Sequence, residues 1–459
     1  MKTLNSVFFE KTFCSIKKMV CHTIKHKISL AVTLSAIFLI LLSVTSCSKD
    51  EDAKIHKVDL VDKTNEVTSG ESLIVLETEE IWTYEDFKNE CLSQFEYTEN
   101  LNSEEFKQRE TLMDQQFKGD YTPLVSLKVK YLSKDPFGND IYLSGKIYVR
   151  LDLYYIQDKV AGIILANHYT ITSDKESPSN ALMYEGMFAT FGYAVVMSDY
   201  YGFGITSDKP QTYLHESSTA QACVDFFLVA KDYLEKSKRV KVGDNHYNLG
   251  YSQGGATTIA VQKLVEAKYA DKIQFRRTFA GGGPYDIEGT YNDLVATNTT
   301  GIPAAIPLII TGMDYSEKLN LDYKTIFREP LLSGYADWIF SKKYTTSDIS
   351  KKMGIKQVDE ILHPNALNAD DSQTARLLTA LRKNSLVSGW NPNQKSPITL
   401  FHSTTDDVVP CLNTNNLLKL YINNGNYPNT YISDYGGHTK AALYFFAKCA
   451  DDIEWFFKP

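Results

Sequence analysis

The chain has 459 residues, of which 43% are hydrophobic and 12% aromatic, and its formal net charge at pH 7 is −8. This length and composition suit one large or two ordinary packed domains and argue against a disordered chain. Lysines outnumber acidic residues before Cys47, so the rest of the chain has a more negative net charge than the whole chain has. Because an acidic surface repels phosphate backbones and the sequence has no stripe of Lys and Arg, we expect no nucleic-acid partner.

Residues 1–46 have the layout of an export signal. A basic stretch precedes a charge-free, mostly apolar run at 28–44, and the small residues of "VTSC" lead to Cys47. This order is typical of a secretory signal peptide, and the true start is open between Met1 and Met19. An uncleaved transmembrane anchor is the alternative, because the apolar run is nearly long enough to span a bilayer. The small residues before Cys47 have no role in such an anchor and favour the signal peptide.

Two segments of different composition follow the signal. Residues 47–80 begin polar and charged with little periodicity, which predicts a tether. Residues 81–120 are rich in Glu, Lys, Gln and Leu and carry apolar side chains at helical spacing, as at Phe87, Cys91 and Phe95. This spacing predicts an N-terminal helical segment, to which the sequence assigns no chemistry.

The pattern beyond residue 121 predicts an α/β fold. Alternating apolar and polar residues flank the turn sequence "KDPFGND", which indicates a hairpin at the antiparallel edge of a sheet. Short apolar runs then alternate with segments of helical period, and the runs lie at 160–168, 192–200, 246–252 and 397–403. This alternation predicts a mostly parallel sheet flanked by helices, in which ligands sit beyond the carboxyl ends of the strands.

A glycine-rich motif closes one of these strands and opens a helix. Gly250, Ser252 and Gly254 form the pattern G-x-S-x-G, which places a serine on a sharp turn between strand and helix. Side chains at the glycine positions would obstruct the close approach of the two elements. Ser252 is therefore the candidate nucleophile, with a plain turn and a capping serine as the alternative.

A serine nucleophile needs a base to take its proton and an acid to hold the base in the correct tautomer. Asp406 and Asp407 follow the strand at 397–403, and His438 lies in a Gly-rich loop before the final helix. His438 is the one histidine that follows these acids, although a surface histidine in a turn is the alternative. The order of nucleophile, acid and base is that of α/β-hydrolases.

At these residues the chain resembles the α/β-hydrolase superfamily and, within it, the secretory lipase and esterase branch. The resemblance rests on "GYSQGG", "DYYGFG", "TYLHESSTAQACVD", "HSTTDDVVP" and "GGH". It implies an α/β-hydrolase fold over residues 121–459, with a helical cap inserted before the acid strand at about 284–392. It also implies a serine hydrolase that cleaves carboxylic esters through an acyl-enzyme. This chemistry needs no cofactor, and the cysteines and histidines lack the spacing of a metal site.

The resemblance assigns the reactive side chains by position, with Ser252 as nucleophile, Asp406 as acid and His438 as base. Asp406 is preferred to Asp407 because relatives carry the acid three residues before a Val-Pro pair, here Val409-Pro410. Asp407 is then expected to face solvent or to bond with the loop backbone.

The oxyanion hole and the cap are less closely defined. The backbone N–H of Gln253 is the expected first oxyanion donor, and the second is expected from "NHYT", with Tyr169 and Thr170 as the two candidates. The aromatic residues of the cap either line the ester site or form the core of the cap itself, and they are Tyr315, Tyr323, Phe327, Tyr335 and Trp338.

The N-terminal motifs resemble those of bacterial lipoproteins. "VTSC" is similar to a lipobox, and "SKDED" is similar to the surface-export signal of lipoproteins in the Bacteroidetes group. This resemblance implies lipidation of Cys47 and attachment to the outer membrane, with exposure at the cell surface. The expected partners are a small-molecule, lipid or carbohydrate ester as substrate and, through the lipid anchor, a membrane.

Two other functions stay open. A peptidase of the prolyl-oligopeptidase type shares the fold and the reactive residues, but nothing in the chain resembles a propeller domain, and Gln253 is more typical of esterases. A non-catalytic surface binding protein on a hydrolase scaffold is the second, and the complete set of reactive residues argues against it.

Overall fold

The computed structural model describes residues 72–76, 79–99, 103–238, 240–393 and 396–453. Cys47 and the predicted signal peptide lie outside the described residues, as does most of the predicted tether. Within the described ranges, none of the helices combines the length and apolar character that crossing a bilayer requires.

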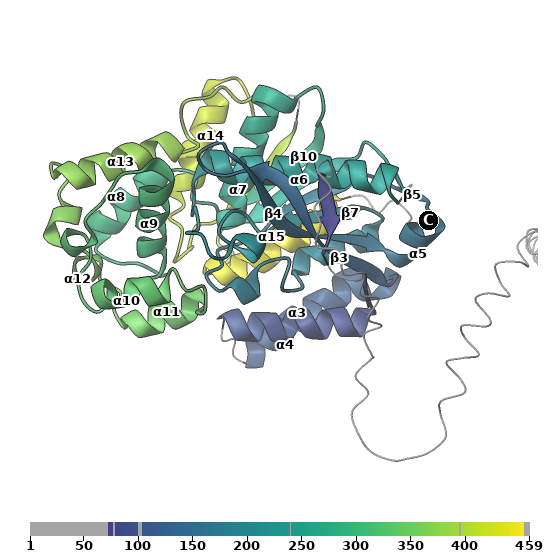
Figure 1. Cartoon of the computed structure of the whole chain (residues 1–459), viewed down its shortest axis with the longest axis horizontal. Coiled ribbons are helices and arrows are strands. Elements are labelled where there is room, and N and C mark those ends of the chain that lie inside the picture. Colours follow the sequence, from purple (N-terminus) through teal and green to yellow (C-terminus); the bar gives the residue numbers. More distant parts are fainter. Residues whose placement is uncertain (1–71, 77–78, 100–102, 239, 394–395, 454–459) are drawn as a thin grey trace, which may run out of the picture. The chain divides into compact units, whose positions relative to one another are not determined.

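A ten-stranded sheet runs through the centre of the described chain (Figure 1). Its order is β1-β3-β4-β7-β6-β9-β10-β11-β12, and β2 also pairs with β3. The pairs from β7 to β12 are parallel, and the pairs that involve β1 to β4 are antiparallel. The strands are β1 (Leu73–Val75), β2 (Glu80–Trp82), β3 (Leu124–Lys134), β4 (Asp140–Arg150), β6 (Ile163–Asn167), β7 (Ala194–Ser198), β9 (His246–Tyr251), β10 (Phe275–Gly281), β11 (Ile398–Ser403) and β12 (Asn429–Ser433). A small separate sheet pairs β5 (Lys159–Val160) with β8 (Lys241–Val242).

This architecture confirms the predicted fold class and the predicted hairpin, which is β3 with β4. The tether prediction differs from the structure at its end. Residues 73–75 and 80–82, which were assigned to the tether or its boundary, form strands that pair with β3. The physical reason is that β3 would otherwise expose a row of unpaired backbone groups, and apolar residues such as Leu73 become buried when they cover it.

The insertion between β10 and β11 consists mainly of short helices, which lie together at the left of Figure 1. They are α8 (Ile287–Thr297), α9 (Ala305–Glu317), α10 (Leu331–Trp338), α11 (Thr346–Met353), α12 (Val358–Ile361) and α13 (Ser372–Asn384). Lys342 holds this insertion against the sheet domain, because its Nζ donates to the carbonyl oxygens of Gly202 and Lys209 over 2.7 and 2.8 Å. Burial lowers the pKa of Lys342 to about 8.

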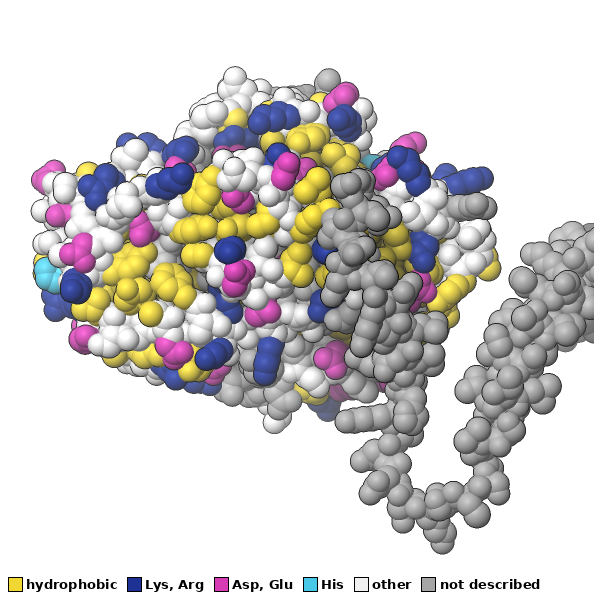
Figure 2. Space-filling view, in the orientation of Figure 1, with side chains coloured by type: hydrophobic (Ala, Val, Ile, Leu, Met, Phe, Trp, Pro, Cys, Tyr) yellow, Lys and Arg dark blue, Asp and Glu magenta, His cyan; other side chains and the backbone are white. Residues whose placement is uncertain are grey.

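One face of the surface carries a mixed pattern of charge. In Figure 2, Lys and Arg side chains are interspersed with Asp and Glu, and hydrophobic side chains gather near the middle of the face. On the described part of this face, such a pattern offers no continuous basic stripe to a phosphate backbone.

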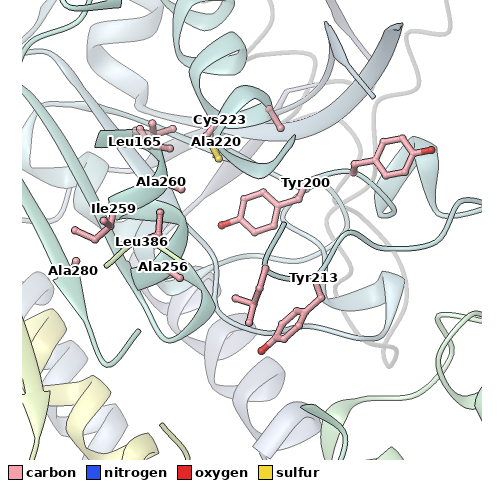
Figure 3. Packing of buried hydrophobic residues seen from close by; sticks show 14 of the residues in the cluster. Leu165, Tyr200, Tyr213, Ala220, Cys223, Ala256, Ile259, Ala260, Ala280 and Leu386 are labelled. Carbon is pink, nitrogen blue, oxygen red and sulfur yellow. The ribbon is translucent and has the colours of Figure 1, made fainter. Parts of the chain in front are cut away.

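Helices cover both faces of the sheet because successive strand residues point to opposite sides. On one side, α6 (Glu216–Lys236) and α7 (Gln253–Leu264) pack against the sheet. Figure 3 shows Ala256, Ile259 and Ala260 of α7 near Leu165 of β6. The small alanines let α7 lie close to the strands, which brings the start of α7 near the strand ends.

The other face is covered by α3 (Tyr84–Glu99), α4 (Ser103–Phe117) and α15 (His438–Asp452). The predicted N-terminal helical segment is therefore two helices. Phe117 anchors α4, since its ring contacts Tyr184, Phe188 and Phe191 at centroid distances of 5.6 to 5.7 Å. Because α4 also packs along α15, the N-terminal segment reaches the part of the fold that carries His438.

The packing of Phe117 predicts a large effect of truncation. Its side chain is fully buried, so Phe117→Ala is expected to lower the free energy of unfolding by about 3–5 kcal/mol. Tyr427→Ala is the control, because Tyr427 is 79% exposed and should change stability by less than about 0.5 kcal/mol. Urea unfolding of both variants measures the difference. A loss below about 1 kcal/mol for Phe117→Ala would contradict the packing of α4 on this face.

Candidate active site

Ser252 lies on a sharp turn between β9 and α7, with φ 60° and ψ −126°. A positive φ is uncommon for a residue with a side chain and marks a constrained turn. A Cβ at Gly250 would collide with the carbonyl oxygen of Gly254, and a Cβ at Gly254 would collide with that of Asn167. The two glycines thus permit the close approach of strand and helix that the sequence motif predicts.

The three predicted reactive side chains form one hydrogen-bonded chain. His438 Nε2 lies 2.9 Å from Ser252 Oγ, and His438 Nδ1 lies 2.7 Å from Asp406 Oδ2. They come from the ends of β9 and β11 and from the first turn of α15. Tyr251 OH donates to the backbone carbonyl of His438 over 2.9 Å, which fixes the start of α15 beside the turn at Ser252.

Asp406 is held as a buried carboxylate. Its Oδ1 accepts hydrogen bonds from the backbone N–H groups of Val408 and Val409, at 2.9 and 2.8 Å. Burial by itself would raise the pKa of Asp406, but the bonds from His438 and from this backbone outweigh it and the pKa lies below its usual value. An ionised Asp406 accepts the Nδ1–H of His438, so Nε2 is free of hydrogen and faces the serine hydroxyl.

Asp407 contacts the same histidine through the backbone. Its Oδ1 accepts the N–H of His438 over 2.8 Å, at the N-terminus of α15. Asp406 therefore contacts the imidazole ring, and Asp407 contacts the main chain that carries it. The expectation that Asp407 bonds to the loop backbone agrees with this geometry.

His402 is a neighbour of the acid that the sequence argument missed. It is fully buried, and its Nε2 lies 3.0 Å from Val409 O and 3.5 Å from Asp406 Oδ2. Both of these atoms are acceptors, so Nε2 carries the hydrogen and Nδ1 accepts the hydroxyl of Thr414 at 2.6 Å. Burial lowers the pKa of His402, so it is a neutral hydrogen-bond donor beside the carboxylate. The sequence feature that could have indicated this contact is the spacing of His402, four residues before Asp406.

The oxyanion candidates lie where the strand connections diverge. β6 and β9 are neighbours in the sheet, but β6 connects to β7 on one side of this pair and β9 connects to β10 on the other side. Ligands commonly bind at the carboxyl ends of two strands whose connections run in opposite directions. Tyr169 and Thr170 follow β6 and line the cavity that holds Ser252. Gln253 is the first residue of α7, so its backbone N–H has no partner within the helix.

That cavity has a volume of about 150 Å³ and is mostly apolar. Its walls come from α4, α15, the segments after β6 and before β7, and two positions in the insertion, and they include Arg109, Leu112, Met113, Tyr169, Thr170, Glu176, Tyr184, Glu185, Ile302, Thr346, Ala442, Leu443 and Phe446. The contribution of the N-terminal helical segment to this lining was not predicted from the sequence. The apolar period of α4 predicts a buried face but carries no information about which elements the helix meets.

The cap aromatics singled out in the sequence do not line this cavity. Tyr323, Phe327 and Tyr335 pack on one another at centroid distances of 5.0 to 5.9 Å. Tyr315 packs on Tyr201, with the two hydroxyls 2.8 Å apart. Tyr323, Phe327 and Tyr335 therefore agree with the alternative in which the rings form the core of the cap itself. Tyr315 instead packs outside the insertion, on the segment that follows β7.

Comparison with known proteins finds solved structures of the same fold and a protein family whose model matches the chain. The chain is similar to a putative hydrolase from Legionella pneumophila subsp. pneumophila str. Philadelphia 1, with 19% identity and a TM-score of 0.67, over 83% of this chain and 95% of that chain. It is also similar to the rice cell wall degrading esterase LipA from Xanthomonas oryzae, with 20% identity and a TM-score of 0.60, over 82% and 95%. Candida antarctica lipase A in its closed state aligns with 16% identity and a TM-score of 0.52, over 72% and 78%.

None of the curated proteins compared with the chain matches it. The family model of the secretory lipases matches residues 181–456, which include Ser252, Asp406 and His438. The match spans more than half of the chain, and the fold is that of the α/β-hydrolases. The chain belongs to the secretory lipase family and is a carboxylic ester hydrolase.

Proposed function

We propose that the protein cleaves carboxylic esters through an acyl-enzyme formed on Ser252, with His438 as general base and Asp406 as the acid that orients it. The observation that carries this proposal is the hydrogen-bonded chain from Ser252 Oγ through His438 to Asp406, at 2.9 and 2.7 Å. A hydroxyl becomes a competent nucleophile when a neutral imidazole nitrogen takes its proton as it attacks.

In the acylation step, Ser252 Oγ attacks the ester carbonyl carbon while its proton passes to His438 Nε2. The imidazolium is stabilised by the carboxylate of Asp406, and it then gives the proton to the departing alcohol oxygen. In deacylation, His438 takes a proton from water, the resulting hydroxide attacks the acyl carbon, and Ser252 Oγ leaves with the proton. Ester and water are consumed, and one alcohol and one acid are released.

The negative oxygen of each tetrahedral intermediate is assigned to backbone N–H donors from Gln253 and from the loop after β6. The loop after β6 offers the N–H groups of Tyr169 and Thr170 as candidates for the second donor, since both residues line the cavity that holds Ser252.

The substrate class is a small-molecule, lipid or carbohydrate ester. The mostly apolar cavity supports an apolar acyl or alcohol group beside Ser252. The family supports a lipid ester, and the similarity to a rice cell wall degrading esterase supports a carbohydrate-linked ester. A prolyl-oligopeptidase-type peptidase would instead cleave amides, and a surface binding protein would cleave neither.

Removal of the serine hydroxyl tests the mechanism. Ser252→Ala is expected to lower turnover of a para-nitrophenyl ester by roughly 10⁴ to 10⁶ and to abolish labelling by a fluorophosphonate, with unchanged melting temperature. His438→Ala should behave alike, because the residues act as a unit. Near-normal ester hydrolysis by Ser252→Ala would refute the mechanism. Anilides with the same acyl groups as the ester substrates separate a peptidase, which cleaves amides, from an esterase, which does not.

The two aspartates provide a matched pair. Asp406→Asn is expected to lower turnover by orders of magnitude, because an amide cannot stabilise the imidazolium and favours the wrong tautomer of His438. Asp407→Asn should cost less than about tenfold, because the amide oxygen still accepts the backbone N–H of His438. Steady-state kinetics of both purified variants on one ester measure the ranking. The reverse ranking would move the acid to Asp407.

We also propose that the protein is exported and lipid-anchored at Cys47 to the outer membrane of a Bacteroidetes-type bacterium, with exposure at the cell surface. The lipobox-like "VTSC" sequence supports the anchor, and membership of a secretory family supports export. Cys47→Ser should abolish lipid attachment and release or misprocess the protein. Metabolic labelling with palmitate and membrane fractionation measure this, and an unlabelled wild-type protein would exclude the anchor.

A further inference from the structure

A second hollow, the outer groove, lies next to the cavity that holds Ser252. It has a volume of about 430 Å³ and a mostly apolar lining, which comes from α4 and α15. Leu112 of α4 and Leu443 of α15 line both the outer groove and the cavity. The other residues that line the outer groove are all exposed, and they are Glu104, Lys107, Gln108, Thr111, Lys440 and Tyr444.

On α4, the cavity and the outer groove adjoin neighbouring faces of the helix. Residues three or four apart in sequence lie on the same face of a helix. Gln108 lines the outer groove, and Arg109 lines the cavity. Leu112 is four residues after Gln108 and three residues after Arg109, so its side chain lies where the two faces join.

α15 shows the same arrangement. Thr439 lines the cavity, and Lys440 lines the outer groove. Leu443 is four residues after Thr439 and three residues after Lys440, so it also lies where two faces join. Because α4 packs along α15, the two leucines lie between the cavity and the outer groove. Both are half-buried, as expected for side chains that have an open groove on one side.

The size of the cavity limits the part of an ester that can enter it. Its volume of about 150 Å³ is similar to that of a cavity that holds benzene, which corresponds to a chain of about six carbon atoms. A longer chain would have to continue into the outer groove, and the side chains of Leu112 and Leu443 occupy that path. The outer groove suits an apolar chain, because Lys107 and Lys440 can lay their methylene stems along it.

α4 lies outside the part of the chain that the family model matches. The match covers residues 181–456, whereas α4 is Ser103–Phe117. Family membership therefore accounts for the reactive residues and for α15, but not for the part of the lining that Leu112 contributes. A limit on chain length that depends on Leu112 is thus not implied by the family.

We propose that Leu112 and Leu443 are specificity-determining residues that restrict the protein to short-chain esters. They separate the cavity from the outer groove, so the half of the ester that enters the cavity is limited to about six carbon atoms. The limit applies to whichever half enters, the acyl group or the alcohol. This inference rests on the proposed function of Ser252, because it concerns the substrate of that same site.

The test compares chain lengths in two series of esters, because either half of an ester can enter the cavity. The acyl series is para-nitrophenyl butyrate and para-nitrophenyl decanoate, and the alcohol series is butyl acetate and decyl acetate. The length ratio of a series is kcat/KM for the long member divided by kcat/KM for the short member. We expect a wild-type length ratio below about 0.1 in at least one series, because a chain that does not fit misplaces the reacting carbonyl carbon.

Truncation of either leucine should join the two spaces. Leu112→Ala and Leu443→Ala are each expected to raise the length ratio of that series by about tenfold or more, the gain from burial of roughly two methylene groups in the outer groove. Hydrolysis of the short member should continue. Leu112→Met keeps the volume of the side chain and should keep the wild-type ratio. Leu378→Ala is the matched control, because Leu378 is a half-buried leucine of α13 that lines neither space.

The outcomes distinguish this inference from the proposed function. A wild-type length ratio near one in both series would overturn the inference without any variant. Alanine variants that fold, as their melting temperatures show, and keep the wild-type ratio would also overturn it, as would an equal change of kcat/KM on both members of a series. In these cases, hydrolysis that depends on Ser252 would leave the mechanism intact. Hydrolysis that persists in Ser252→Ala would instead refute the proposed function.

Discussion

The close approach of α7 to the end of β6 is the contact on which the rest of the site depends. Gly254 lies so near the carbonyl oxygen of Asn167 that a side chain would collide with it. A buried polar network reinforces the contact, because Asn167 Nδ2 donates to Asn248 Oδ1 at 2.9 Å and to Thr258 Oγ1 at 2.8 Å. These bonds join β6, β9 and α7, so the turn at Ser252 and the loop after β6 are held as one unit.

A second set of hydrogen bonds joins the acid loop to the histidine loop. Ser403 Oγ donates to Gly436 O and accepts the N–H of Tyr435, at 2.5 and 3.1 Å. Together with Asp407, which accepts the N–H of His438, this serine links the end of β11 to the start of α15 through local contacts. The backbone that carries the imidazole ring is thus held by contacts from the end of β11, which supports the orientation of the ring toward Asp406.

The parts of the structure that were predictable from the sequence have local causes. The turn at Ser252 requires glycines at fixed positions, and buried parallel strands require short apolar runs, so both leave a signal within a few residues. β10 and β12 were missed because their sequences lack this signal. β10 contains two adjacent arginines, and β12 is an edge strand whose residues are exposed or half-buried.

Other features depend on contacts between distant segments and could not be predicted. An apolar stripe on α4 predicts that one side is buried, but its neighbour α15 lies over 300 residues away in the sequence. The hydrogen-bonded contact of Ser252, Asp406 and His438 followed from chain order and motif, whereas the shape of the cavity around them depends on tertiary packing.

The joint contribution of α4 and α15 to the lining of the cavity has a consequence for biosynthesis. Part of the lining comes from the early part of the described chain and part from its last helix, which also carries His438. A nascent chain whose last helix is still in the ribosome has Ser252 but lacks both α15 and His438. Under the proposed mechanism such an intermediate would lack ester hydrolase activity, which would then arise only when the last helix has folded onto the rest of the chain.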